Sequence, residues 1–363
     1  MSSSQIIETM KERILHYHPG CQVVSVPVAD GGEGSVDSFL TALGGEKIRI
    51  KTKGSWGEEI DSFYGMLPDG TAVIEMAASA GLPQVGDRKD PSKTTTFGVG
   101  ELILDAARKG AKRLVIGLGG SSTNDAGCGA AAACGVTFLN KEGKRFTPVG
   151  GTLDEITHID VSTMDPAVRA LPITAMCDID NPFYGPSGAA AVYGPQKGAD
   201  EAMVASLDAK MVYLAGLIKK ELGDDLQSLP GSGAAGGMGG GMKAFFSARL
   251  QMGIETVLEV TGFDSLASGA DMIFTGEGKI DGQSLRGKVV IGVARKAKKL
   301  GVPVIALVGD IADGIEAAYD EGVTGIFSIN RVAVPYKEAR LRAQSDLSLT
   351  MDNILRFMKS MKL

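Results

Sequence analysis

One stretch of the chain indicates the fold more clearly than any other: Leu114-Val-Ile-Gly-Leu-Gly-Gly-Ser-Ser-Thr-Asn-Asp-Ala-Gly-Cys-Gly-Ala-Ala-Ala-Ala-Cys134. The apolar run from Leu114 to Leu118 predicts a buried strand, and the alanines before Cys134 predict a closely packed helix. A strand that leads through small residues into a helix is the repeating step of α/β folds. Because free backbone N–H groups and the helix dipole point at such a turn, it is also suited to binding an anion.

Two interpretations of this turn remain open. Its small residues are the glycines Gly119 and Gly120 and the hydroxyl residues Ser121, Ser122 and Thr123. The glycines would let the backbone approach a phosphate, and the hydroxyls would donate to it. Asn124 and Asp125 could hold a metal or orient a hydroxyl. The alternative is a tight turn before a capped helix, in which Asn124 or Asp125 is the cap.

Composition limits the class of protein. A length of 363 residues predicts two α/β domains rather than one core. A hydrophobic fraction of 44% with 22% charged residues is ordinary for a soluble globular protein. The net charge of −6, without a basic stripe, argues against a nucleic-acid partner.

Several features predict a cytoplasmic protein with small-molecule partners. We expect no membrane association, because no apolar run is long enough to span a bilayer. The first residues also lack the pattern of a secretory signal. Cysteines occur without a C-x-x-C pair, at Cys21, Cys128, Cys134 and Cys177. We expect buried thiols of a reducing compartment.

Predicted strands alternate with predicted helices along the chain. The strands are expected at residues 22–28, 48–51, 61–66, 71–76, 114–118, 172–177, 271–275, 302–308 and 325–329. The helices are expected at residues 2–18, 35–43, 98–108, 201–222, 242–249, 289–300 and 347–361. This alternation predicts largely parallel sheets with ligands at the carboxyl ends of the strands. The glycine-rich segment 231–241 is either a flexible linker or a loop that wraps a substrate.

Acidic loops follow four of the predicted strands. Their residues are Asp30 and Glu33, Asn124 and Asp125, Asp178 with Asp180 and Asn181, and Glu277 with Asp281. Each loop alone could be a helix cap or an Asx turn. Four of them at carboxyl strand ends, beside glycine-rich loops, favour Mg²⁺-assisted phosphoryl transfer.

Two lysines lie in short glycine-containing turns. Lys197 belongs to Tyr193-Gly-Pro-Gln-Lys-Gly198, which holds a cation among small residues. Lys288 ends Gly282-Gln-Ser-Leu-Arg-Gly-Lys288, which matches G-x-x-x-x-G-K. Because Val289 stands where a P-loop has Ser or Thr, we interpret Lys288 as a phosphate partner outside a true P-loop. Solvated surface charges are the alternative for both lysines.

Taken in order, these segments resemble the bacterial glycerate kinase type 1 family. The matching stretches are residues 28–35, 117–129, 177–182, 194–198, 236–240 and 275–288. The resemblance implies ATP-dependent, Mg²⁺-dependent phosphorylation of D-glycerate, with 2-phosphoglycerate favoured over 3-phosphoglycerate. It also implies two unlike α/β domains with the active site in the cleft between them. One is flavodoxin-like and discontinuous (1–65 plus 286–363), and the other is inserted (66–285). A homodimer is an open expectation.

On this basis we assign hypothetical roles to the polar residues. Asp178 is the first choice, and Asp125 the second, for the group that accepts the hydroxyl proton. Lys197 or Arg286 would pair the glycerate carboxylate. Phosphates would be held by Gly119, Gly120, Ser121, Ser122, Thr123, Asn124 and Lys288. The substrate would contact Asp30, Glu33, Asn181, Ser284 and Arg286. Glu277 and Asp281 would bind Mg²⁺.

The sequence departs from the family pattern at its start. Members open with a short apolar strand and a segment like Asp-Ser-Phe-Lys ahead of the helix that begins here near Ser2. Their loss would leave segment 22–28 without a partner strand. We favour a start set inside a longer chain, and the alternative is an impaired form that binds ligands without turnover. A nucleotide-binding oxidoreductase is a weaker alternative, because no G-x-G-x-x-G follows a strand with an acidic residue about 20 positions on.

Overall fold

The computed structural model describes residue 1 and residues 3–28 and 31–361. The chain forms two compact units, which we call the terminal unit (Met1–Val28 and Ile254–Leu363) and the central unit (Ala29–Gly253). These boundaries differ from those expected from the sequence, at about residues 65 and 285. Both units combine strands and helices, so the α/β class is confirmed. No helix in the described ranges has both the length and the apolar character needed to cross a membrane.

A six-stranded sheet forms the centre of the central unit, in the order β1-β2-β3-β4-β7-β8 within the described residues. Its strands are β1 (Glu46–Lys53), β2 (Glu59–Met66), β3 (Thr71–Glu75), β4 (Arg113–Gly117), β7 (Ile173–Met176) and β8 (Arg249–Gln251). The first two form an antiparallel hairpin, whereas β3, β4, β7 and β8 are parallel. Every residue of β3 is buried, as expected for a parallel strand that is covered on both faces.

Helices and one small strand pair surround this sheet. The helices are α2 (Ser35–Leu43), α3 (Ala77–Ala80), α4 (Leu82–Val85), α5 (Phe97–Arg108), α6 (Cys128–Ala133), α7 (Pro166–Arg169), α8 (Ala189–Tyr193), α9 (Glu201–Glu221) and α10 (Ala234–Phe246). The small pair is β5 (Thr137–Leu139) with β6 (His158–Asp160). The long helix α9 begins where predicted, because the Asp200 side chain accepts a hydrogen bond from Met203 N.

The glycine-rich segment is not the flexible linker of the first sequence interpretation, and only part of it is helical. It forms the first part of α10, with left-handed backbone at Ala235, Gly236 and Gly237. A Cβ on Gly236 would collide with the carbonyl oxygen of Thr123, so the glycine lets α10 pack directly on the turn after β4. The segment is therefore part of the core around that turn rather than a linker.

The terminal unit is built on a parallel sheet in the order β11-β10-β9. Its strands are β9 (Ile273–Ile280), β10 (Val304–Ile311) and β11 (Val323–Ser328). Its helices are α1 (Ser3–Tyr17), α11 (Gly253–Val260), α12 (Phe263–Ala267), α13 (Val289–Leu300), α14 (Ala317–Asp320) and α15 (Tyr336–Ser360). Side chains of β10 alternate between two hydrophobic clusters. Val304, Ala306 and Val308 pack with α13, whereas Ile305 and Leu307 pack with α1 and α15.

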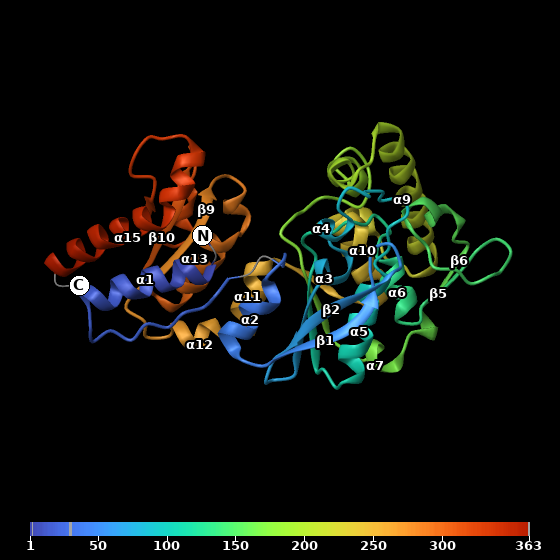
Figure 1. Ribbon diagram of the computed structural model, residues 1–363, viewed down its shortest axis with the longest axis horizontal. Coiled ribbons are helices and arrows are strands. Elements are labelled where there is room, and N and C mark those ends of the chain that lie inside the picture. The colour runs from blue at the N-terminus through green and yellow to red at the C-terminus, as the bar shows by residue number, and fades with distance from the viewer. Residues whose placement is uncertain (2, 29–30, 362–363) are drawn as a thin grey trace. The chain divides into compact units, whose positions relative to one another are not determined.

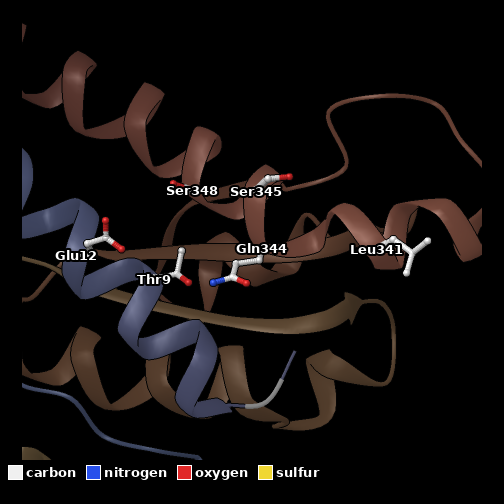
Figure 2. Close-up of a pocket in the computed structure, with 6 residues that line it drawn as sticks. All are labelled: Thr9, Glu12, Leu341, Gln344, Ser345 and Ser348. Carbon is white, nitrogen blue, oxygen red and sulfur yellow. The ribbon is translucent and has the colours of Figure 1, made fainter.

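Helices α1 and α15 lie beside one another (Figure 1), joined by an Arg13–Asp352 ion pair of 3.0 Å. Arg356 Nε also donates to Tyr17 Oη at 2.8 Å. An open groove between the two helices is lined by Thr9 and Glu12 and by polar residues of α15 (Figure 2).

Some sequence expectations were wrong. Segment 22–28 is not a strand: it pairs with no strand among the described residues, and alternation alone cannot hold a strand without a hydrogen-bonded neighbour. Helix α15 begins at Tyr336 rather than at residue 347. Cys128, Cys134 and Cys177 are buried free thiols as expected, but Cys21 is exposed.

Candidate functional site

The carboxyl ends of the parallel strands bring three of the four acidic loops to one edge of the central sheet. Gly117 of β4 lies opposite Met176 of β7, so the turns that follow these strands leave the sheet side by side. The segment that begins at Gly31 lies against them, because Gly119 N donates to Gly31 O at 3.1 Å. Glu33 and Asp178 are therefore neighbours of the turn after β4. Asp30 lies outside the described residues.

The polar side chains of the turn after β4 face into the fold. Ser121, Ser122, Thr123, Asn124 and Asp125 are all buried. Ser122 Oγ lies 2.8 Å from Ser55 Oγ and donates to Ala80 O at 3.0 Å. Only the glycines remain accessible, with Gly120 exposed and Gly119 half-buried. This placement favours contact of a ligand with the glycine backbone rather than with the four side chains from Ser121 to Asn124.

Asp125 caps the helix that follows it. Its carboxylate accepts hydrogen bonds from Gly127 N at 3.1 Å and Gly129 N at 3.2 Å, at the start of α6. It also accepts from Thr96 N at 2.7 Å and Thr96 Oγ1 at 2.9 Å. Burial raises the pKa of Asp125, and these hydrogen bonds oppose that shift. The hydrogen bonds from Gly127 and Gly129 agree with the capping alternative for Asp125.

Lys197 is buried beside the same turn. It ends the 3₁₀ helix Pro195–Lys197 and is only 2% exposed. Its Nζ donates to Ser121 Oγ and to Thr123 O, both at 2.7 Å. Burial lowers the pKa of Lys197 to about 7, although the Asp125 charge acts in the opposite direction. Both protonation states are therefore populated near neutral pH, and the ammonium fixes the turn.

Two oxygens of the turn have no hydrogen-bond partner among the described residues. They are Thr123 Oγ1 and Asn124 Oδ1, and both atoms are buried. The Asn124 amide instead donates through Nδ2 to Met211 Sδ at 3.3 Å. An unpaired buried polar group costs about 1–3 kcal/mol. The turn thus keeps polar groups where apolar ones would favour stability.

The turn after β7 supplies the accessible polar groups. Asp178 is half-buried, and Gly253 N donates to its Oδ1 at 2.7 Å. Asn181 is held from both ends, since Tyr193 Oη donates to its Oδ1 at 2.7 Å and its Nδ2 donates to Ser187 O at 2.8 Å. Glu33 is exposed, and its Oε1 lies 4.0 Å from the position that a Cβ on Gly120 would take. Two accessible carboxylates, Glu33 and Asp178, thus lie at the carboxyl edge of the sheet.

Sequence reasoning missed Glu75, the last residue of β3. Its side chain is 3% exposed, and its Oε1 accepts a hydrogen bond from Val36 N at 2.6 Å at the start of α2. Burial raises the pKa of Glu75, and the N–H groups of Val36 and Gly34 oppose the shift. Glu75 therefore anchors the segment that contains Glu33. A carboxylate that closes an apolar strand was the available signal.

The fourth acidic cluster belongs to the terminal unit. Glu277 lies on β9, and Asp281 Oδ1 accepts hydrogen bonds from Gln283 N at 2.9 Å and Ser284 N at 3.3 Å. Burial raises the pKa of Glu277, while Ser284 and Lys288 lower it. The structure thus brings together Glu277, Asp281, Ser284 and Lys288. Arg286, in the same segment, is exposed.

The Gly282–Lys288 segment is not a P-loop. It contains the 3₁₀ helix Ser284–Arg286, and Lys288 Nζ donates to Gln283 Oε1 at 3.1 Å. Glu277 Oε1 is buried and has no hydrogen-bond partner within the described ranges, which fits a cation ligand. The described residues contain no group of three or more carboxylate, His or Cys side chains placed to hold a metal. A metal here would depend on phosphate and water for its remaining ligands.

Comparisons with known proteins agree with one another. The sequence matches the Glycerate kinase family over residues 1–359. It is 41% identical to a protein named glycerate kinase from Halalkalibacterium halodurans, over 98% of this chain and 94% of that protein. It is also 41% identical to glycerate 2-kinase from Escherichia coli, over 91% of this chain and 87% of that protein.

A solved structure gives the same result. The crystal structure of a protein assigned as glycerate kinase 2 from Salmonella typhimurium LT2 is 36% identical to this chain and superimposes with a TM-score of 0.87. The match covers 100% of this chain and 96% of that one. The chain belongs to the glycerate kinase family and is therefore a phosphotransferase.

Proposed function

We propose that this protein transfers the terminal phosphoryl group of ATP to D-glycerate and forms 2-phosphoglycerate. The observation that supports this most is the family match over residues 1–359. The choice of the 2-hydroxyl is supported by the E. coli relative, which is named glycerate 2-kinase and aligns with 91% of this chain. A cytoplasmic location is part of the same proposal.

Asp178 is the group that accepts the proton of the glycerate hydroxyl. It is half-buried at the carboxyl end of β7, and the Gly253 N–H fixes one of its oxygens at 2.7 Å. A positioned carboxylate raises the rate of such a proton transfer by about 10²–10⁴-fold. Asp125 is a positioning residue in this proposal, because its hydrogen bonds with Thr96, Gly127 and Gly129 hold the turn and α6 in place.

The accessible backbone of Gly119 and Gly120 contacts phosphate oxygens. Lys197 acts through the turn, since its ammonium binds Ser121 and Thr123 and is almost completely buried. Arg286, which is exposed, is then the better candidate for the carboxylate of glycerate. Glu33 and Asn181 contact the substrate in this proposal. Asp30 and Ser284 are also proposed to contact the substrate, and for them this rests on the sequence pattern alone.

The terminal-unit cluster is the proposed site for Mg²⁺ and for part of the nucleotide phosphate. Glu277 and Asp281 would hold the ion, and Lys288 would contact a phosphate oxygen. When bound, Mg²⁺ neutralises phosphate charge that develops during transfer. The unpartnered Glu277 Oε1 supports this assignment.

Coupled measurement of ADP release tests the proposal on the full chain. With Mg²⁺ and ATP, we expect turnover with D-glycerate, and much slower turnover with L-glycerate, lactate or glycerol. Chelation of Mg²⁺ should abolish the reaction. Folded protein that releases no ADP with D-glycerate, or that prefers lactate, would refute the assignment of the acceptor.

A further inference from the structure

A second hollow, of about 350 Å³, lies in the central unit and is not explained by the roles given above. Its walls include Lys53, Trp56, Lys93, Thr95, Phe97 and Thr147. We call it the indole pocket. Its volume is at the lower end of the range for small-molecule sites, about 300–1,000 Å³. The groove between α1 and α15 (Figure 2) has no aromatic or cationic side chain among its lining residues, so it offers less to an organic anion.

The indole pocket lies near the turn after β4, to which hydrogen bonds connect it. Thr95 N donates to Ser55 O at 2.9 Å, and Ser55 Oγ lies 2.8 Å from Ser122 Oγ. The next residue along, Thr96, donates through its N–H to Asp125 at 2.7 Å. The lining residue Thr95 is therefore linked to the proposed phosphate-contacting turn through Ser55 and through its chain neighbour Thr96.

Two aromatic rings give the indole pocket flat apolar surface. Trp56 and Phe97 both line it. The guanidinium carbon of Arg88 lies 5.6 Å from the centre of the Trp56 ring. Indole Nε1 is buried and has no hydrogen-bond partner in the described part of the chain. The two rings suit stacking of a planar heterocycle.

Cationic groups at the same place favour an anion. Lys53 forms no ion pair within the described ranges, whereas Lys93 pairs with Asp90 at 2.9 Å. The neighbouring carboxylates are already engaged by backbone N–H groups. Glu101 accepts from Lys53 N, and Glu58 accepts from Trp56 N at 3.0 Å. The Lys53 ammonium forms an ion pair with neither carboxylate and can contact a ligand, and Arg88 lies beside the Trp56 ring.

A planar ring system and negative charge occur together in a nucleotide. We propose that the indole pocket binds the donor nucleotide, with its base against Trp56 and a phosphate near Lys53. This inference deepens the proposed function, because it rests on ATP being the phosphoryl donor. It identifies Trp56 and Lys53 as residues that determine nucleotide affinity.

Ligand binding in the indole pocket can be followed by tryptophan fluorescence. Trp56 is the only tryptophan of the chain, so fluorescence excited beyond the tyrosine band reports on this site alone. We would titrate the full chain separately with ATP, adenosine and inorganic tripolyphosphate. The expected result is saturable quenching by ATP and by adenosine, with adenosine binding more weakly and tripolyphosphate producing little quenching. Equal quenching by ATP and tripolyphosphate would overturn the assignment of the base, because it would indicate an anion site only.

Two variants test separately how the base and the phosphate of ATP contribute to binding. Lys53→Ala should weaken ATP binding about tenfold and leave adenosine binding unchanged. Lys144→Ala, at an exposed lysine in another loop, is the matched control. Trp56→Ala should raise the KM for ATP by about tenfold with little change in kcat, and Trp56→Phe should restore most of the affinity.

The failure of this inference can be distinguished from failure of the proposed function. If ADP forms with D-glycerate but neither Trp56→Ala nor Lys53→Ala changes the KM for ATP, the pocket assignment is wrong and the kinase assignment stands. If ATP quenches Trp56 saturably but no ADP forms, the pocket assignment stands and the proposed acceptor is wrong. Because Lys53 is exposed, Lys53→Ala should fold even if Trp56→Ala does not.

Discussion

The turn after β4 and the Glu277–Lys288 segment both place polar residues after a parallel strand, but they use them differently. In the turn, Asp125 and Lys197 are buried and engaged by hydrogen bonds from or to the protein. In the segment, Glu277 Oε1 has no partner among the described residues, and Lys288 binds a neutral side chain. The first region is preorganised by its own contacts, whereas the second has charge that a cation or phosphate could satisfy. Similar acidic, glycine-rich sequences can therefore serve the fold in one place and a ligand in another.

The largest effect should come from the accessible carboxylate beside the preorganised turn. Asp178→Asn keeps an acceptor for Gly253 N–H but removes the proton acceptor, so kcat should fall by about 10²–10⁴-fold with a modest change in KM. Steady-state ADP formation measures it. Asp180→Asn, at an exposed neighbour, should stay close to the unmodified rate. An unchanged kcat in Asp178→Asn would remove Asp178 from the reaction.

Replacement of Asp125 should lower the stability of the fold rather than act directly on the phosphoryl transfer. Asp125→Asn leaves one acceptor oxygen for donors that now bind two, so the free energy of unfolding should fall by roughly 2 kcal/mol or more. Urea denaturation followed by Trp56 fluorescence would measure the loss. The surface variant Asp154→Asn is the control. A stable Asp125→Asn protein that has lost its activity would instead support a direct chemical role for Asp125.

Lys197 should make stability depend on pH. Its pKa is lowered from 10.5 to about 7 in the folded protein, so the unfolded chain binds more protons between these values. The free energy of unfolding should therefore rise from about pH 7 towards pH 10, by at most about 1.4 kcal/mol per pH unit. Lys197→Met should flatten this rise. If the slope is the same in both proteins, Lys197 is not the titrating group.

The smallest effect is expected in the terminal-unit segment. Glu277→Gln removes charge from a carboxylate with one buried oxygen, Oε1, that has no partner among the described residues, so the Mg²⁺ concentration for half-maximal activity should rise about tenfold. Stability should change little. Asp271→Asn, at an exposed carboxylate ahead of β9, is the control. If Glu277→Gln responds to Mg²⁺ as the unmodified protein does, the ion is held elsewhere.

The local pattern of apolar and small residues was sufficient to predict many of the strands and helices. The apolar run before Gly119 predicted β4, and the small residues after it predicted α6. Alternation of strands and helices predicted the parallel order of β3, β4 and β7. The same pattern was misleading at segment 22–28, since a strand also needs a neighbour to pair with. In α10, packing on the turn outweighs the weak helix propensity of glycine.

The direction of the polar side chains was not predictable from the sequence. A serine or threonine in a loop can donate to a ligand or to a nearby carbonyl, and both choices look alike in the sequence. Ser122 donates to Ala80 O, which is distant in sequence, so only the folded chain shows that it faces inward. Burial of Lys197 depends in the same way on residues far from its own turn. For Asp125, the hydrogen bonds at the start of α6 agree with the capping alternative.

The central claim is that the chain phosphorylates the 2-hydroxyl of D-glycerate, and the most direct measurement is the ³¹P NMR spectrum of the reaction with Mg²⁺ and ATP. We predict that ATP signals give way to those of ADP and to a phosphomonoester doublet, because the phosphorus of 2-phosphoglycerate couples to a single neighbouring proton. A triplet would place the phosphate on the 3-hydroxyl instead. Unchanged ATP, or inorganic phosphate alone, from folded protein would contradict the claim.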